Sequence, residues 1–173
     1  MADKSLLIVW HSRTGASRQL AQAAARGARA SVHQDGGLPG AVRVDRVHAS
    51  KVDAARMLAA SAYLFVAPEN LGSLSGQMKE FFDRTYYGVI DRIAARPYAV
   101  IVAAGSDGRG AVRQVERIAT GWRLKPVADP MIVNTAAQTA EAILAPKRLP
   151  PEALRAAADL GAALAAGVAM GIF

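Results

Sequence analysis

Three apolar runs, each followed by a loop of small residues and then by a helix-forming segment, most constrain what this chain can fold into. The runs lie at residues 5–10, 62–67 and 98–103. Short apolar runs without alternation are typical of strands buried on both faces, and such strands need helices above and below the sheet. The repeated order of strand, loop and helix therefore predicts an α/β fold with a parallel sheet.

Two weaker strands complete the predicted sheet. Residues 42–47 alternate apolar and charged side chains, as in a half-exposed edge strand, and residues 131–133 follow a proline. Helices are predicted over residues 17–30, 50–60, 75–86, 111–121 and 151–170, the second opening with a capping box at Ser50 and Asp53. Residues 31–41 are predicted to form a glycine-rich connection, and Pro68 is predicted to end its strand. We expect a five-stranded parallel sheet in a three-layer α/β/α sandwich.

The composition fits one globular domain over residues 1–173. Of the 173 residues, 52% are hydrophobic and 20% are charged, which is the balance of a chain with a sizeable core. The sequence contains no cysteine, which excludes disulfides, thiolate catalysis and cysteine-ligated metals. The three histidines, His11, His33 and His48, lack the spacing of metal ligands, so no metal site is predicted.

The termini and the absence of cysteine favour a soluble cytoplasmic protein. No signal peptide is recognised at the N-terminus, and the apolar tail at residues 160–173 is shorter than a membrane span of about 20 residues. The net charge of +7 raises nucleic acid as a partner, but the basic residues are scattered, so no nucleic-acid partner is predicted. The last helix, with Ile172 and Phe173, could pack on another subunit of a homo-oligomer or on the sheet.

The loop after the first strand is predicted to bind a phosphate. It comprises Ser12, Arg13, Thr14, Gly15, Ala16 and Ser17 and leads into a helix. Unpaired backbone N–H groups and the positive end of the helix dipole favour an anion there, and hydroxyl groups can donate to it. Capping of the helix by Ser12 or Thr14 is the structural alternative.

Neither of two better-known phosphate loops is present, because the chain has no G-x-x-x-x-G-K-[ST] motif and no G-x-G-x-x-G after the strand. The stretch from Ser12 to Ser17 instead closely resembles the [ST]-x-T-G-x-[ST] loop of flavodoxin-like proteins, which holds the phosphate of FMN. That resemblance implies the strand order 2-1-3-4-5. In such a sheet the loops after strands 1, 3 and 4 meet where the strand order reverses.

A second motif extends the resemblance. Residues 68–79, with the Phe-Phe-Asp-Arg that follows, look like the proline-led loop and helix of NAD(P)H-dependent FMN reductases and flavodoxin-like quinone reductases. The resemblance implies that the first loop holds the phosphate and that two further loops enclose the flavin ring and ribityl chain. The second loop comprises Pro68, Glu69, Asn70, Leu71, Gly72 and Ser73. The third loop comprises Gly105, Ser106, Asp107, Gly108 and Arg109. No catalytic acid or base is implied, since the flavin carries the redox chemistry.

Two departures from the flavodoxin pattern bear on function. The loops offer Leu71 where flavodoxins stack aromatic rings, and the charge is basic where electron carriers are acidic. Both favour a reductase that takes a hydride from NAD(P)H and passes electrons to a quinone, a flavin or another small acceptor. A flavodoxin-type electron carrier and a binding domain that has lost the flavin are the alternatives.

Four side chains in or near these loops have separate interpretations. Glu69 is expected to accept a hydrogen bond from backbone or flavin rather than to transfer a proton. Asp83 and Arg84 are expected to be structural. Arg109 belongs to a stripe with Arg113 and Arg117 that is either solvated or in contact with the phosphates of NADPH.

Overall fold

The structure is a computed structural model that describes residues 4–33 and 42–173. Its main strands are β1 (Lys4–Trp10), β2 (Val42–His48), β3 (Ala62–Asn70), β5 (Pro97–Ala104) and β7 (Met131–Asn134). All five were predicted, and their ends differ from the predicted ends by at most three residues. Of the glycine-rich connection predicted over residues 31–41, residues 31–33 belong to the first helix and the remainder lies outside the described residues.

The sheet has the predicted order with a divided fifth strand. β2, β1, β3 and β5 are neighbours in that order, and both β6 (Lys125–Pro126) and β7 pair with the far edge of β5. Every one of these pairings is parallel. The two pieces are separated by residues 127–130, where Pro130 has no N–H to donate to β5.

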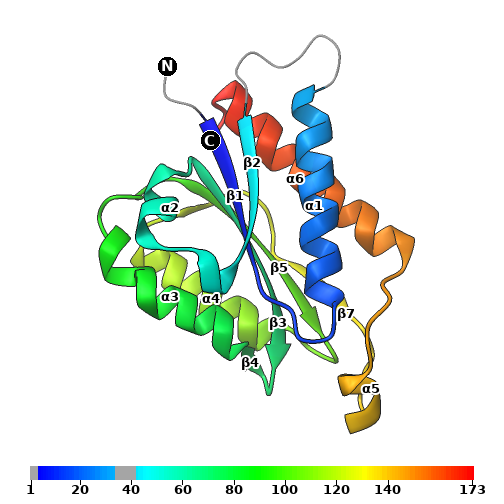
Figure 1. The fold of residues 1–173 in the computed structure, drawn as a ribbon. Coiled ribbons are helices and arrows are strands. Elements are labelled where there is room, and N and C mark those ends of the chain that lie inside the picture. Colours follow the sequence, from blue (N-terminus) through cyan, green and yellow to red (C-terminus); the bar gives the residue numbers. More distant parts are fainter. Residues whose placement is uncertain (1–3, 34–41) are drawn as a thin grey trace.

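Helices cover both faces of the sheet (Figure 1). On one face lie α1 (Ala16–His33) and α6 (Pro151–Met170), and on the other lie α3 (Gly76–Val89) and α4 (Arg109–Gly121). Because β1 alternates its side chains, Leu7 and Val9 join the core under α3 and α4, whereas Leu6 and Ile8 join the core under α1 and α6. The three-layer α/β/α sandwich is therefore confirmed.

The two cores are built from different residues. The side under α3 and α4 is filled by aromatic rings, among them Phe65, Phe81, Phe82 and Trp122. The side under α1 and α6 is rich in alanine, which lets those helices approach closely. A Cβ atom on Gly161 of α6 would overlap the backbone of Ala24, and one on Gly27 would overlap that of Ala158.

Helix α6 corrects the length argument made for the apolar tail. The helix is 20 residues long and contains an 18-residue stretch with a mean hydropathy of 1.4, so its length and composition alone would allow it to cross a membrane. It begins at Pro151, as predicted, with Glu152 in its first turn. Its close packing against α1 accounts for its apolar character as a core helix of the sandwich.

The predicted capping box is wrong in detail. Residues Ala49–Lys51 form a single 3₁₀ turn, and α2 (Ala54–Ala59) begins only after Asp53. The Asp53 carboxylate accepts a hydrogen bond from the backbone N–H of Arg56 at 2.8 Å, so the acid itself is the N-cap. The structural interpretation of Arg84 is confirmed, because its guanidinium donates to the carbonyl groups of Val52 and Ala49.

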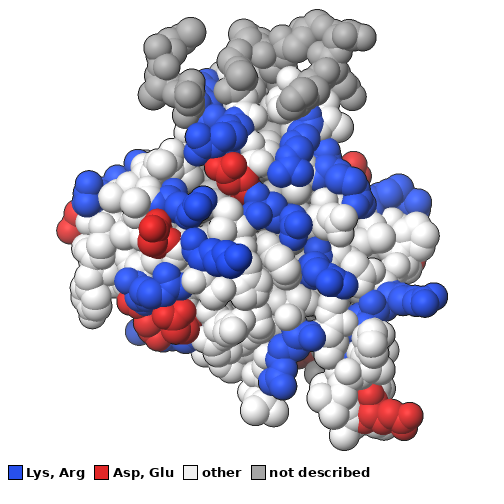
Figure 2. All heavy atoms as spheres, viewed as in Figure 1, with Lys and Arg blue, Asp and Glu red and all other residues white. Residues whose placement is uncertain are grey.

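Basic side chains are spread over several elements rather than gathered at one place. Figure 2 shows them across the face that carries α1 and β2, with few acidic side chains between them. On α1, the side chains of Arg18, Arg26 and Arg29 are exposed to solvent. The net charge therefore belongs to a broad solvated surface.

Candidate functional site

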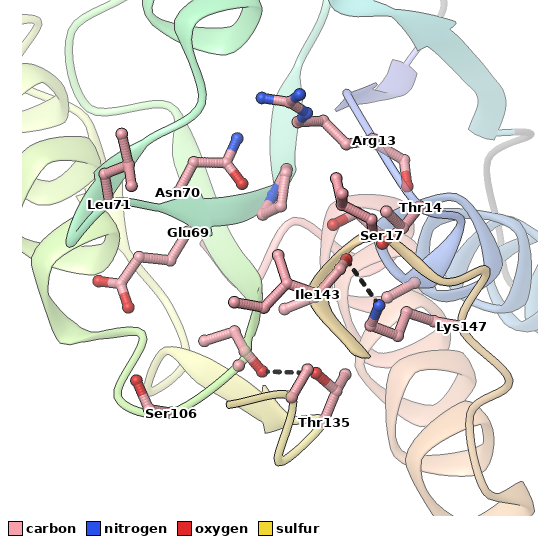
Figure 3. Close-up of a pocket in the computed structure, with 18 of the residues that line it drawn as sticks. Arg13, Thr14, Ser17, Glu69, Asn70, Leu71, Ser106, Thr135, Ile143 and Lys147 are labelled. Carbon is pink, nitrogen blue, oxygen red and sulfur yellow. Dashed lines mark hydrogen bonds between the residues drawn. The ribbon is translucent and has the colours of Figure 1, made fainter. Parts of the chain in front are cut away.

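A cavity of about 440 Å³ lies beyond the carboxyl ends of β1, β3 and β5. All three predicted loops contribute to its wall (Figure 3). The predicted residues that line it are Ser12, Arg13, Thr14, Ala16, Ser17, Pro68, Glu69, Asn70, Leu71, Gly72, Gly105 and Ser106. The other predicted residues, Gly15, Ser73, Asp107, Gly108 and Arg109, stand behind or beside this wall rather than in it.

The first loop turns through Gly15 before α1 begins. Gly15 has φ +97°, a left-handed conformation that favours glycine, and its N–H donates to the Ser12 hydroxyl at 3.0 Å. Ser12 therefore closes the turn instead of capping the helix. The helix starts at Ala16, one residue earlier than predicted, which places Ser17 in its first turn.

Ser17 is the most informative residue of this loop. Its side chain is fully buried, lines the cavity, and has no hydrogen-bond partner among the residues that the structure describes. A buried hydroxyl without a partner costs free energy, about 1–3 kcal/mol, unless a ligand satisfies it. Together with the free N–H groups of the first turn of α1, it provides donors for an anion such as a phosphate.

The second loop is a tight hairpin, which corrects the expectation that Pro68 ends the strand. β3 continues to Asn70 and pairs antiparallel with β4 (Ser73–Leu74). Pro68 has no backbone N–H to donate within the strand, but its carbonyl accepts a hydrogen bond from the backbone N–H of Ser75 at 3.3 Å. The turn residues Leu71 and Gly72 have φ of 53° and 71°, as in a two-residue hairpin turn.

Glu69 fixes this hairpin to the third loop. Its carboxylate accepts hydrogen bonds from the backbone N–H groups of Gly108 at 2.6 Å and Ala111 at 3.1 Å, and so caps α4. The expectation that Glu69 accepts a hydrogen bond is confirmed, and the donor is backbone. Gly110 allows the close approach, because a Cβ atom there would overlap the carbonyl of Gly72.

The third loop lines the cavity with Gly105 and Ser106 only. Asp107 and Arg109 are exposed and form an ion pair at 3.6 Å. Arg109 begins α4, and Arg113 and Arg117 follow it along an exposed face of that helix. Among the described residues, this stripe is a solvated surface outside the cavity.

Sequence reasoning missed a fourth wall. The segment after β7 contributes Thr135, Ala137, Ile143, Leu144 and Lys147, the last three from or just after the short helix α5 (Ala140–Leu144). The backbone N–H of Lys147 donates to the carbonyl of Thr14 at 2.8 Å (Figure 3). No local sequence pattern marks this segment as part of the site, because its position depends on a contact between Lys147 and Thr14, which are more than 130 residues apart in the sequence.

His11 connects the first two loops behind the cavity. It is buried, and its Nδ1 lies 2.8 Å from the Ser75 hydroxyl. Burial lowers the pKa of His11, and the neighbouring His48 and Arg13 lower it further. The fold therefore favours the neutral imidazole at this position.

Acid is expected to weaken the fold through His11. Because its pKa is lower in the folded state than in the unfolded state, the unfolded chain binds more protons, and the free energy of unfolding should fall as the pH drops below about 6.5. Urea unfolding between about pH 8 and pH 5 should show a smaller loss in His11→Asn, whose side chain can still reach Ser75. An unchanged pH dependence in that variant would contradict the assignment.

The sequence matches a known family model. The model for NADPH-dependent FMN reductase covers residues 7–138, which includes all three predicted loops. No curated protein matches the sequence at a significant level.

Solved structures share the fold at low sequence identity. A flavodoxin from the domain Archaea aligns with a TM-score of 0.72 and 15% identity, covering 95% of this chain and 98% of its own. A WrbA-like flavodoxin from Agrobacterium tumefaciens aligns with a TM-score of 0.68 and 16% identity, covering 96% and 98%. The Flv1 flavodiiron core from Synechocystis also aligns, with a TM-score of 0.72 and 16% identity, covering 96% of this chain and 36% of its own. These matches confirm a flavodoxin-like fold.

Proposed function

The chain belongs to the NADPH-dependent FMN reductase family and is a flavin-binding oxidoreductase, and from this premise we propose that it passes electrons from NAD(P)H through bound FMN to a quinone, a flavin or another small acceptor. The observation that carries the proposal is the buried Ser17 hydroxyl, which has no partner among the described residues and faces the cavity at the start of α1. This donor set fits a phosphate monoester.

The chain's own residues bind and orient the cofactor. Ser12, Thr14 and Ser17 would hold the phosphate, with Gly15 shaping the turn. The hairpin at Pro68, Asn70 and Leu71 and the third loop at Gly105 and Ser106 would contact the ribityl chain and ring, and Ser73, Asp107, Gly108 and Arg109 would support those loops from outside the cavity wall. Four further residues that are predicted to contact the cofactor also line the cavity: Arg13, Ala16, Glu69 and Gly72.

The flavin, when bound, supplies the acceptance of a hydride and the release of electrons. The protein contributes a fixed frame rather than a proton donor, because Glu69, the carboxylate in the wall, is engaged by two N–H groups of α4. Leu71 at the hairpin tip is fully exposed, and none of the described residues that line the cavity is aromatic. A ring face that no aromatic side chain covers would be accessible to a nicotinamide and then to an acceptor.

Purification with excess FMN tests the proposal. We expect a yellow protein that quenches flavin fluorescence on titration and then oxidises NADPH or NADH steadily when a quinone or free flavin is added. Colourless protein without quenching would refute flavin binding. Reduction only through a separate reductase protein, without direct NAD(P)H oxidation, would instead identify an electron carrier.

A further inference from the structure

The connection between β7 and α6 forms a strap over the cavity. We use "strap" for residues 135–149, which contain α5. In Figure 1, α5 stands away from the sandwich at the end of the molecule where β3 and β5 terminate. None of its five residues is buried, so the contacts at its two ends hold it in place.

Both ends of the strap are anchored to loops of the site. At the first end, the hydroxyl of Thr135 donates to the carbonyl of Ala104 at 3.1 Å. At the second end, the amide of Gln19 on α1 donates to the carbonyl of Lys147 at 2.7 Å and accepts from the N–H of Leu149 at 3.3 Å. With the bond from Lys147 to Thr14, the strap links the end of β5 to the phosphate loop.

The ammonium group of Lys147 closes the end of α5. It donates to the carbonyl groups of Ala142 at 2.6 Å, Ile143 at 2.9 Å and Ala145 at 2.7 Å. These three bonds use all the donors of the ammonium group and satisfy carbonyls at the negative end of the helix. One side chain therefore sets the position of α5 relative to the phosphate loop.

The strap presents two aliphatic side chains to the cavity. Ile143 and Leu144 line it, yet they are 50% and 68% exposed. Figure 3 shows Ile143 between Thr14 and Ser17 of the phosphate loop and Glu69 and Leu71 of the hairpin. Ligand pockets are lined mainly by apolar side chains, so two adjacent aliphatic side chains on the wall of this cavity offer a surface that a ligand can cover.

We propose that Ile143 and Leu144 contact the apolar part of the FMN ring system, and that Lys147 is the positioning residue that holds them there. The proposal rests on the proposed function, since FMN is its ligand. It also accounts for the absence of aromatic residues among those that line the cavity, because the strap supplies apolar area from a part of the chain outside the three loops. The same two residues would then border the place where the acceptor reaches the ring.

Binding of two flavins to Ile143→Ala separates ring contact from phosphate contact. Riboflavin has the same ring and ribityl chain as FMN but no phosphate. Loss of aliphatic contact should weaken FMN and riboflavin by the same factor, about tenfold, measured by fluorescence quenching. Ile172→Ala, which truncates an exposed isoleucine outside the cavity, is the matched control and should bind both flavins like the original protein.

The outcomes are distinct. Unchanged affinity in Ile143→Ala, or a loss confined to FMN, would overturn the ring contact while leaving flavin binding intact. Failure of the unaltered protein to bind either flavin would instead refute the proposed function, and this inference with it.

Lys147→Met tests the positioning role without turnover. Removal of the three hydrogen bonds should speed amide hydrogen exchange in residues 140–145 of the flavin-free protein by about tenfold, and should weaken riboflavin binding as well as FMN binding. Lys79→Met, which removes an exposed lysine paired with Asp83 on α3, is the control and should leave exchange in the strap unchanged. Exchange in Lys147→Met equal to that of the unaltered protein would overturn the role of Lys147.

Discussion

Thr14→Glu is expected to abolish FMN binding while the fold is retained. Thr14 lines the cavity beside Ser17, and its side chain is half-buried. A carboxylate there would stand within a few ångströms of a phosphate that carries up to two negative charges. At about 4 Å and an effective dielectric constant of about 20, each pair of like charges costs about 4 kcal/mol, or roughly a thousandfold in affinity.

Fluorescence titration with FMN measures this loss, and circular dichroism checks the fold. Gln22→Glu is the charge control, because it adds the same negative charge to an exposed position of α1 outside the cavity. That variant should bind FMN nearly as well as the unaltered protein. Tight FMN binding by Thr14→Glu would show that the phosphate lies elsewhere.

Gly161→Ala is expected to cause a large loss of stability. The Cβ atom would overlap the backbone carbonyl of Ala24, where α6 crosses α1. Backbone atoms cannot rotate away as a flexible side chain can, so the two helices must separate. We expect the free energy of unfolding in urea to fall by about 3 kcal/mol or more.

Gly76→Ala is the matched control for this substitution. Gly76 is the first residue of α3, is exposed, and has no atom within 4 Å of an added Cβ. The same chemical change there should leave stability unchanged or raise it by up to about 1 kcal/mol. A Gly161→Ala variant as stable as Gly76→Ala would show that the crossing of α1 and α6 is looser than the structure places it.

The two substitutions test different parts of the molecule: Gly161→Ala tests the packing of the fold, and Thr14→Glu tests the proposed binding site. The crossing of α1 and α6 lies in the alanine-rich core, and Gly161 and Ala24 do not line the cavity. Its disruption should therefore destabilise the fold. Thr14 lies on a loop held by Gly15 and by the strap, so its side chain can change without disturbing the strands. Binding and stability are therefore expected to respond to different substitutions.

Much of the fold is encoded in local patterns. The apolar runs predicted the three central strands because a strand covered on both faces cannot alternate. The sequence predicted a helix from residue 151, where α6 begins, and predicted that the loop from Ser12 to Ser17 leads into α1. These features depend on neighbours within a few residues, which is the range over which periodicity and capping act.

The completed site depends on contacts between distant residues. Glu69 caps a helix about 40 residues further on, His11 meets Ser75, and Lys147 meets Thr14. Pro68 remains within β3 because it pairs with Ala103 of β5 and the strand then continues into the hairpin with β4, and β6 and β7 pair with two different stretches of β5. A hydrogen bond between residues this far apart leaves no periodic trace in either segment, so residues such as Ile143 and Lys147 become part of the site only when the folded sheet brings the strap to the phosphate loop.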